Sequence, residues 1–332
     1  MLDELLRSRD WLLADGATGT NLFDMGLVAG EAPEAWLDAH PDRIVALHRR
    51  FVEAGADIIL TNTFGCNRRR LALHGLQDQT RRLNEAAVGL ARQAAAEAGR
   101  PIVIAGSVGP TGDLLAPLGP LTAQDCEEVF VEQIEGLAAG GAHVAWIETM
   151  SAVEEMHAAA RAAHRCGLPY VITASFDTAG RTMMGHAPGA LAQDLTALDP
   201  PPRAVGANCG VGAADLVASI LEIAAPVPGA VVVAKANCGV PRVTGDAVVY
   251  SGTPELMQDY ARLARDAGAR IIGGCCGTSP GHLAAMRKAL DAHAPRQRPD
   301  LATVIAALGP LVAPPVAAGR TRRTRRSGGE PA

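Results

Sequence analysis

The chain has 332 residues, of which 48% are hydrophobic and 20% are charged, and its formal net charge is -5. This balance is typical of a soluble globular protein and gives no general attraction to nucleic acid or to acidic membranes. The amino terminus lacks the basic start and apolar stretch of a signal peptide, and no apolar run approaches the ~20 residues that span a bilayer. The seven cysteines are odd in number and scattered, so we expect a cytoplasmic protein without a disulfide framework.

Eight short apolar segments recur along the chain, and a helical stretch follows each of them. In chain order we expect strands at 11–14, 57–60, 102–105, 144–147, 170–173, 204–206, 231–234 and 269–272. The clearest amphipathic stretches between them are 43–54, 80–98, 123–139 and 254–267. Continuous apolar strands are typical of a parallel sheet that is buried on both faces. Eight strand-helix units predict an α/β fold, the (β/α)8 TIM barrel, with residues 1–294 as a single domain.

A doubly wound open sheet is the alternative, but such a sheet normally has only about five or six strands. No Gly-x-Gly-x-x-Gly motif opens a helix after the first strand, which further disfavours it.

The composition changes at Pro295, after which Pro, Ala and Arg dominate and 320–326 is a basic run. We expect 295–332 to be a largely disordered tail. Within it, 301–311 can instead form a helix against the barrel exterior or against a partner subunit, so an oligomer is compatible with the sequence.

Polar residues and thiols follow the predicted strands at their carboxyl ends, where the active site of a TIM barrel lies. These residues are Asp15, Thr61, Asn62, Glu148, Asn208, Cys209, Asn237, Cys275 and Cys276. So many polar side chains at successive strand ends are hard to explain by packing, so they indicate a functional site.

Three of these residues suit a soft metal ion. Cys275 and Cys276 directly follow the eighth strand, and Cys209 follows the sixth, so all three can meet across the barrel mouth. The alternative is that the adjacent pair consists of buried small hydrophobes. Three thiolates favour Zn2+ and leave a fourth position for substrate, and zinc would lower the pKa of a substrate thiol.

At the same rim, the carboxyl groups of Glu148 and Asp15 can hold an ammonium group of the substrate. The alternatives are that Glu148 forms a salt bridge within the protein and that Asp15 belongs to an Asp-Gly turn.

With these segments assembled, the chain resembles the homocysteine S-methyltransferase family. That family includes betaine-homocysteine methyltransferase, S-methylmethionine-dependent enzymes and the homocysteine-binding module of cobalamin-dependent methionine synthase. The resemblance runs from residue 11 to about 290 and rests on the segments 15–20, 61–65, 106–112, 147–149, 206–209 and 273–278.

The resemblance implies an enzyme that methylates the sulfur of L-homocysteine to form methionine. It implies Cys209, Cys275 and Cys276 as zinc ligands, with Asn237 filling the metal's open position in the substrate-free state. It also implies that Asp15, Gly16 and Glu148 surround the amino acid's backbone groups; we add Thr61 to the predicted substrate contacts because it lies at the second strand's end. Cys238 follows Asn237, and we expect it to be a small buried residue, although it could replace a ligand.

Two departures from the family's betaine enzymes concern the methyl donor. Thr149 follows the glutamate where those enzymes have Tyr, and Phe64-Gly65 stands in place of Phe-Tyr. Both changes point toward the methionine synthase module, whereas the overall run resembles bacterial stand-alone proteins assigned to betaine.

We predict betaine or another onium compound as the donor, with Phe23, Trp36 and Phe64 as the aromatic wall. The alternative donor is a methyl-corrinoid carried by a separate protein. The acceptor could be a thiol other than homocysteine, and the alternative to an enzyme is a non-catalytic zinc- or thiol-binding barrel.

Overall fold

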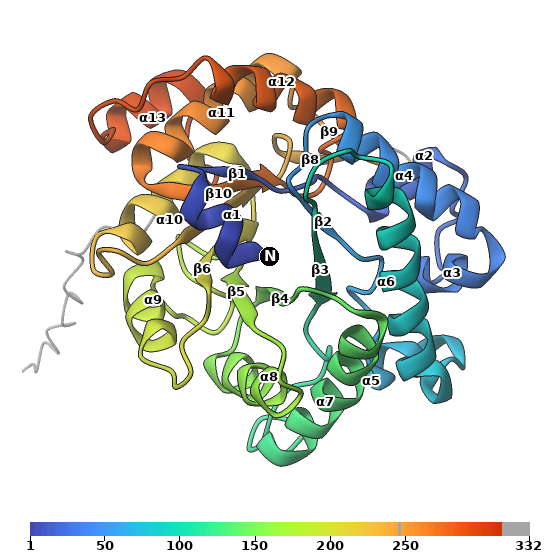
Figure 1. Ribbon diagram of the computed structural model, residues 1–332. Coiled ribbons are helices and arrows are strands. Elements are labelled where there is room, and N and C mark those ends of the chain that lie inside the picture. The colour runs from blue at the N-terminus through green and yellow to red at the C-terminus, as the bar shows by residue number, and fades with distance from the viewer. Residues whose placement is uncertain (245–246, 314–332) are drawn as a thin grey trace, which may run out of the picture.

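A ring of eight parallel strands forms the centre of the protein, and helices surround it (Figure 1). This is a computed structural model, which describes residues 1–244 and 247–313. The strands of the ring are β1 (Leu12–Leu13), β2 (Ile58–Leu60), β3 (Val103–Val108), β4 (Val144–Met150), β5 (Tyr170–Ala174), β6 (Ala204–Cys209), β7 (Val232–Ala236) and β10 (Ala269–Gly274). Their hydrogen-bonded order is β1-β10-β7-β6-β5-β4-β3-β2, and a parallel bridge between Ala14 and Ile58 joins its two ends. The predicted TIM barrel is therefore confirmed, with each strand at its predicted segment.

Helices connect the strands on the outside of the ring. They are α4 (Pro41–Glu53), α6 (Thr80–Ala96), α7 (Ala123–Gly140), α8 (Val153–Arg165), α9 (Pro188–Thr196), α10 (Ala213–Ala224), α11 (Pro254–Ala267) and α12 (Pro280–Asp291). Side-chain caps set several starts: Thr122 accepts from the N–H of Asp125, and Ser279 forms a capping box with His282. The loops after β1 and β2 hold α2 (Gly19–Asp24), α3 (Trp36–Ala39), α5 (Arg68–Leu71) and three short 3-10 helices, Pro33–Ala35, Ala72–His74 and Gln77–Gln79.

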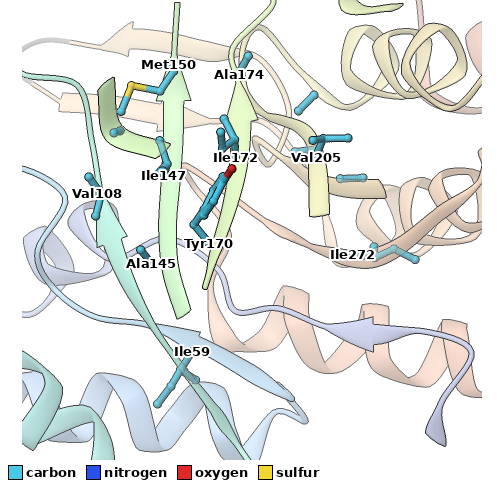
Figure 2. Packing of buried hydrophobic residues seen from close by; sticks show 14 of the residues in the cluster. Ile59, Val108, Ala145, Ile147, Met150, Tyr170, Ile172, Ala174, Val205 and Ile272 are labelled. Carbon is cyan, nitrogen blue, oxygen red and sulfur yellow. The ribbon is translucent and has the colours of Figure 1, made fainter. Parts of the chain in front are cut away.

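Apolar side chains fill both sides of the strand ring. Those pointing outward, such as Ile59, Ile147, Ile172 and Ile272, pack under the helices (Figure 2). Those pointing inward form a second cluster, which includes Leu12, Ile58, Val103, Trp146, Val171 and Ile271. Helix α1 (Leu2–Ser8) adds Leu2, Leu5 and Leu6 to this inner cluster, and in Figure 1 it lies across the centre of the ring. The barrel is thus closed at its amino-terminal face.

Two elements extend the structure beyond the predicted strand-helix pattern. An antiparallel hairpin, β8 (Pro241–Thr244) and β9 (Ala247–Tyr250), is inserted between β7 and α11 and has no counterpart among the predicted strands. Helix α13 (Leu301–Leu308) packs on α10 and α11 through buried Val304, which agrees with the helix considered for 301–311. Asp215 in α10 accepts hydrogen bonds from the N–H groups of residues 312 and 313.

The part of the chain that packs on the barrel therefore continues past the predicted boundary at 294, because α13 has an apolar face of its own. The basic run at 320–326, predicted to be disordered, lies outside the described residues. Within residues 1–244 and 247–313, no helix has the length and apolarity needed to cross a bilayer.

Candidate active site

Three thiols come together at the carboxyl-terminal mouth of the barrel. Cys209 ends β6, and Cys275 and Cys276 follow β10, so β7 lies between them in the sheet. Ala236 of β7 pairs with Cys209 on one side, and its carbonyl accepts the N–H of Cys275 at 2.7 Å on the other. The three Sγ atoms all lie within 4.8 Å of one another, and those of Cys209 and Cys276 are 4.0 Å apart. The structure therefore brings the three predicted ligands into one cluster.

Asn208 fixes the backbone on which this cluster is built. Its Oδ1 accepts from the N–H of Thr149 at 2.8 Å and from the Thr173 hydroxyl at 2.6 Å, and its Nδ2 donates to Thr149 Oγ1 at 2.7 Å. Nδ2 also lies 3.8 Å from Cys275 Sγ. Thr149 and Cys209 both have left-handed backbone, with φ of 61° and 63°, which side chains with a Cβ rarely adopt. The Asn208 network holds these two strand ends in that conformation.

Asn237 directly follows β7, the strand that lies between β6 and β10 in the sheet. Its Nδ2 donates to the carbonyl of Gly210, the residue after Cys209, at 2.5 Å, and its side chain is buried. Its Oδ1 is buried without a hydrogen-bond partner in the part of the chain that the structure describes. A buried polar oxygen normally has a partner, so Asn237 Oδ1 is available to another group. The three soft thiols by themselves form a donor set that fits a zinc ion.

The three thiols interact strongly with one another. Hydrogen bonds from Cys209 and then Cys275 lower the pKa of Cys276, whereas hydrogen bonds with Cys275 and Cys276 raise the pKa of Cys209 far above its ordinary range. Like charges so close together repel, so the three thiols do not easily ionise together. A bound cation would be needed to keep all three deprotonated, as metal ligation requires.

Cys238 stays outside this cluster. Its thiol is buried, and its Sγ is not in the group of ligand atoms formed by Cys209, Cys275 and Cys276 within the described chain. Its backbone N–H donates to the carbonyl of Cys276, so it supports the loop through the main chain.

Tyr250, at the end of the β8–β9 hairpin, covers the cysteine loop. Its ring leaves no room for a side chain at Gly277, where a Cβ would lie 2.3 Å from Tyr250 Cγ. The sequence pattern missed this residue because the hairpin itself was not predicted.

A buried ion pair lies beneath the thiols. Lys235 Nζ of β7 donates to Asp15 Oδ1 at 2.7 Å, and each side chain is only 2% exposed. Asp15 Oδ2 accepts the N–H of Leu60 at 2.7 Å, which ties the end of β1 to β2. Burial alone would lower the pKa of Lys235, but attraction to Asp15 and Glu148 outweighs it and raises that pKa. Lys235 was not among the predicted site residues, although a lysine within an apolar strand is a signal that could have found it.

Glu148 lies at the end of β4 in the same pocket. Its Oε1 accepts the hydroxyl hydrogen of Ser107 at 2.5 Å. Burial raises its pKa to about 7, with Lys235 acting against that rise. The carboxyl group is therefore poised between its neutral and ionised forms, and an ammonium group beside it would favour the ionised one.

Gly16 and Thr61 complete the predicted substrate contacts. A Cβ at Gly16 would lie 2.5 Å from the carbonyl oxygen of Thr278, so only glycine fits there. The Thr61 hydroxyl is already paired with Thr63 and with the N–H of Ser107, which makes Thr61 a support for the pocket wall.

A pocket of about 530 Å³ joins the thiols to the surface at the barrel mouth. Glu148, Lys235 and the three cysteines line its depth, and Phe23 and Phe64 line its outer part. The aromatic wall differs from the prediction. Trp36 is buried at 3% exposure, stacked edge-on against His40, and is not among the lining residues. The Arg70 guanidinium lies 5.8 Å from the Phe64 ring centre, so that ring already has a cation beside it.

Known proteins resemble this chain over most of its length. The model of the family described as homocysteine S-methyltransferase matches residues 12–290. Methionine synthase of Mycobacterium leprae is 30% identical over 308 residues, and that of Mycobacterium tuberculosis is 31% identical over 302 residues. These alignments cover 86% and 85% of this chain but only 25% of each relative, so the chain spans about a quarter of their length.

Among solved structures, the metallated form of the homocysteine methyltransferase MmuM from Escherichia coli superposes with a TM-score of 0.74. The match covers 86% of this chain and 99% of that one at 24% identity, so it supports the barrel fold.

Proposed function

The chain belongs to the homocysteine S-methyltransferase family, and on this basis we propose that it transfers a methyl group to the sulfur of L-homocysteine, giving methionine. The observation that carries the proposal is the cluster of three thiols, all within 4.8 Å, at the inner end of a pocket that also holds a buried carboxyl group. A thiol substrate with an ammonium group suits both features.

We propose that Cys209, Cys275 and Cys276 hold Zn2+, with Asn237 Oδ1 available to the ion when no substrate is bound. Zinc held there would lower the pKa of a substrate thiol and keep its sulfur nucleophilic near neutral pH. Asn208 keeps Cys209 and Thr149 in their left-handed conformations and so preserves the spacing of the thiols.

The acidic residues orient the amino acid. Glu148 accepts the substrate ammonium as a charge-assisted hydrogen-bond partner, and Ser107 holds its carboxyl group in place. Lys235 pairs with Asp15 and favours its ionised form against the effect of burial, and Asp15 in turn fixes the loop that starts at Gly16. The homocysteine sulfur then forms its new bond to the methyl carbon as the donor's bond to that carbon breaks with its electron pair, so no general base is needed at that moment.

The donor occupies the outer part of the pocket. An onium compound such as betaine would place its charge near Phe23, Phe64 and the Glu34 carboxyl group, which is 5% exposed and lines the pocket. Because Trp36 is buried and Arg70 lies beside Phe64, these groups form an incomplete cage for a cation.

That incomplete cage favours a second candidate, a methyl-corrinoid carried by a separate protein. Such a donor is held by its own protein and requires an open mouth more than a cage. Phe23 and Leu73 line the pocket and are 51% and 78% exposed, which leaves an apolar rim for a large donor. The methionine synthase relatives, of which this chain covers a quarter, also support this candidate.

A donor panel tests the proposal. Purified zinc-loaded protein is incubated with homocysteine and, in turn, betaine, S-methylmethionine, S-adenosylmethionine or methylcobalamin, and methionine is measured by mass spectrometry. Methionine from any donor supports the methyltransferase and identifies the donor class. Stoichiometric zinc without methionine from any of them would rule out the free donors, leaving a methyl-corrinoid on a separate protein or a non-catalytic zinc-binding barrel.

A ligand variant tests the role of the thiols. Cys275→Ala should abolish both stoichiometric zinc and activity, because two thiols cannot replace the three-ligand set. Cys166→Ala, at a half-buried thiol after α8 and outside the cluster, should retain both. Full activity in Cys275→Ala would contradict the mechanism.

A further inference from the structure

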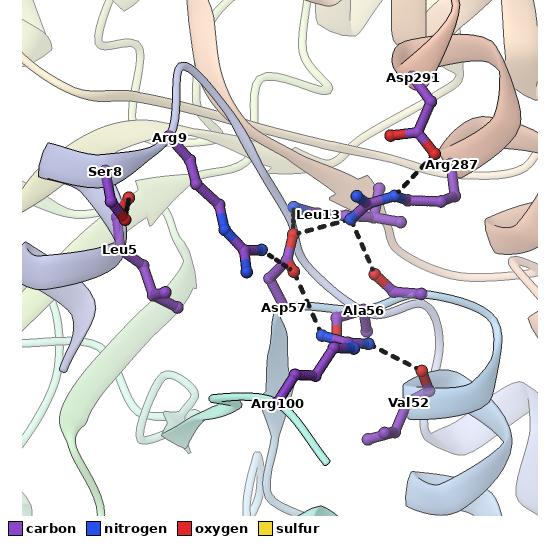
Figure 3. Close-up of polar contacts among 11 residues, drawn as sticks. Leu5, Ser8, Arg9, Leu13, Val52, Ala56, Asp57, Arg100, Arg287 and Asp291 are labelled. Carbon is purple, nitrogen blue, oxygen red and sulfur yellow. Dashed lines mark hydrogen bonds and ion pairs between the residues drawn. The ribbon is translucent and has the colours of Figure 1, made fainter. Parts of the chain in front are cut away.

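The opposite, amino-terminal face of the barrel contains a second cluster of charged groups, centred on Asp57. This residue precedes β2 and is only 1% exposed. Figure 3 shows three arginines converging on its carboxylate: Arg9 before β1, Arg100 before β3 and Arg287 from α12. The nearest nitrogens lie 2.6 Å (Arg9), 3.3 Å (Arg100) and 3.3 Å (Arg287) from its oxygens.

The carboxylate is fully used within the protein. Besides the three guanidinium groups, the N–H of Leu13 donates to Asp57 Oδ2 at 2.9 Å. The arginines are not used up in the same way. Among the described residues, Arg9 has a side-chain hydrogen bond only to Asp57, so most of its N–H groups are free for another acceptor. Arg100 also donates to the carbonyls of Val52 and Ala56, and Arg287 donates to the carbonyl of Gly55 and to Asp291, so these two keep fewer free N–H groups.

The three guanidinium groups face a cavity of about 450 Å³. The side chains of Arg9, Arg100 and Arg287 are 35%, 29% and 32% exposed, whereas Asp57 is covered. Asp10 also lines the cavity, which leaves its lining with three positive and two negative groups. Outside this lining, Asp291 pairs with Nε of Arg287. A ligand entering the cavity would therefore meet arginine N–H groups together with the Asp10 carboxylate, while the Asp57 carboxylate, 1% exposed, is held by its four donors.

The arrangement has more positive charge than the buried carboxylate requires. One guanidinium can neutralise Asp57, and each additional one repels the others. Burial lowers the pKa of Arg100 and repulsion from Arg287 and Arg9 adds to this effect, whereas attraction to Asp57 acts against it. The Trp11 ring holds Arg287 in place, with its guanidinium carbon 4.8 Å from the ring centre. Arginine donors fixed in this way match the geometry of phosphate oxygens.

We propose that this arginine-lined cavity at the amino-terminal face binds a phosphate group, either free or on a small phosphorylated molecule. The bound phosphate would accept N–H groups from Arg9, Arg100 and Arg287 and offset their mutual repulsion. The three arginines come from three parts of the fold, namely the α1–β1 loop, the segment before β3 and α12, and Asp57 adds the segment before β2. A ligand bound to the arginines would therefore stabilise the barrel by bridging these segments.

Thermal unfolding tests the site in the full-length protein. Inorganic phosphate, pyrophosphate and adenosine monophosphate are titrated separately against chloride at matched ionic strength. At a concentration about tenfold above the Kd, the folding equilibrium constant should rise about elevenfold and Tm by about 2–4 °C. A larger effect from adenosine monophosphate or pyrophosphate than from phosphate would identify a phosphorylated molecule as the ligand. No saturable rise beyond that in chloride for any of the three would overturn the proposal.

Variants locate the effect. Arg9→Gln should abolish the phosphate-induced rise in Tm while the protein still folds, because Arg100 and Arg287 continue to neutralise Asp57. Arg49→Gln, at an exposed arginine paired with Glu97 on the surface, should leave the rise unchanged. If Arg9→Gln did not fold, Arg9→Lys, which keeps the charge but loses the guanidinium fork, should weaken phosphate binding. An unchanged phosphate response in the folded Arg9 variant would refute the site.

Discussion

Replacing Glu148 with glutamine should make the protein more stable at alkaline pH. Burial raises the pKa of this carboxyl group from 4.5 to about 7, so ionising it costs more in the folded protein than in the unfolded chain. At ~1.4 kcal/mol per pH unit, this difference corresponds to about 3 kcal/mol when the group is fully ionised in both states. Glutamine has no such cost, and its amide oxygen can still accept the Ser107 hydrogen bond.

The pH dependence has a definite sign. Below about pH 4.5 both states keep the proton, and Glu148 costs nothing. Between pH 4.5 and 7 the unfolded chain loses the proton while the folded protein retains it, so the free energy of unfolding falls as pH rises. The stabilisation by Glu148→Gln should therefore be close to zero at pH 4.5 and reach about 3 kcal/mol at pH 8.

Urea unfolding of the metal-free protein at pH 4.5 and pH 8 measures this difference. Glu97→Gln, at an exposed carboxylate paired with Arg49, serves as the control and should change stability by less than about 0.5 kcal/mol at either pH. If Glu148→Gln stabilised the protein equally at both pH values, or not at all at pH 8, the reasoning from burial would be wrong.

Three further predictions concern the same pocket. Zinc-loaded Glu148→Gln should raise the KM for homocysteine about tenfold or more through loss of the ammonium partner, with a smaller change in kcat; steady-state kinetics would show an unchanged KM if Glu148 does not contact substrate. Lys235→Met should lower the free energy of unfolding, measured in urea, by about 3–5 kcal/mol, because Asp15 is left buried without its partner. The double variant Lys235→Met/Asp15→Asn should recover most of that loss, since it no longer buries an unpaired carboxylate. Asn208→Ala should weaken zinc affinity about 10–100-fold in a chelator competition, since Thr149 and Cys209 lose their support; an unchanged affinity would show that the strand ends hold their conformation without it.

Much of the fold could be read from local pattern. Each predicted strand is a short apolar run, and burial on both faces of a parallel strand depends mainly on that run. Cys209, Cys275 and Cys276 could be placed together because strand order in a TIM barrel follows chain order. The hairpin at 241–250 and the full extent of α13 were harder to predict, since they lie outside the repeating strand-helix unit.

The candidate site shows where local pattern stops being informative. Trp36 was expected at the pocket wall because aromatic residues are scarce in this chain, yet it packs in the core. Aromatic character indicates what a side chain can bind but not which way its helix faces. Tyr250 was missed for the related reason that its contact with the cysteine loop depends on a hairpin whose position only the packed chain defines.

The sequence by itself determined the barrel, the order of its strands and the presence of three cysteines at the ends of its sixth and eighth strands, because these depend on residue type and on a repeating local pattern. Only the tertiary structure decided that Lys235 neutralises Asp15, 220 residues away, and that three arginines from separate segments surround Asp57. Those pairings require the ring to close, which brings distant strand ends within hydrogen-bonding distance. The closure of the ring decides which charged side chains become partners, and such pairs produce no repeating pattern in the sequence.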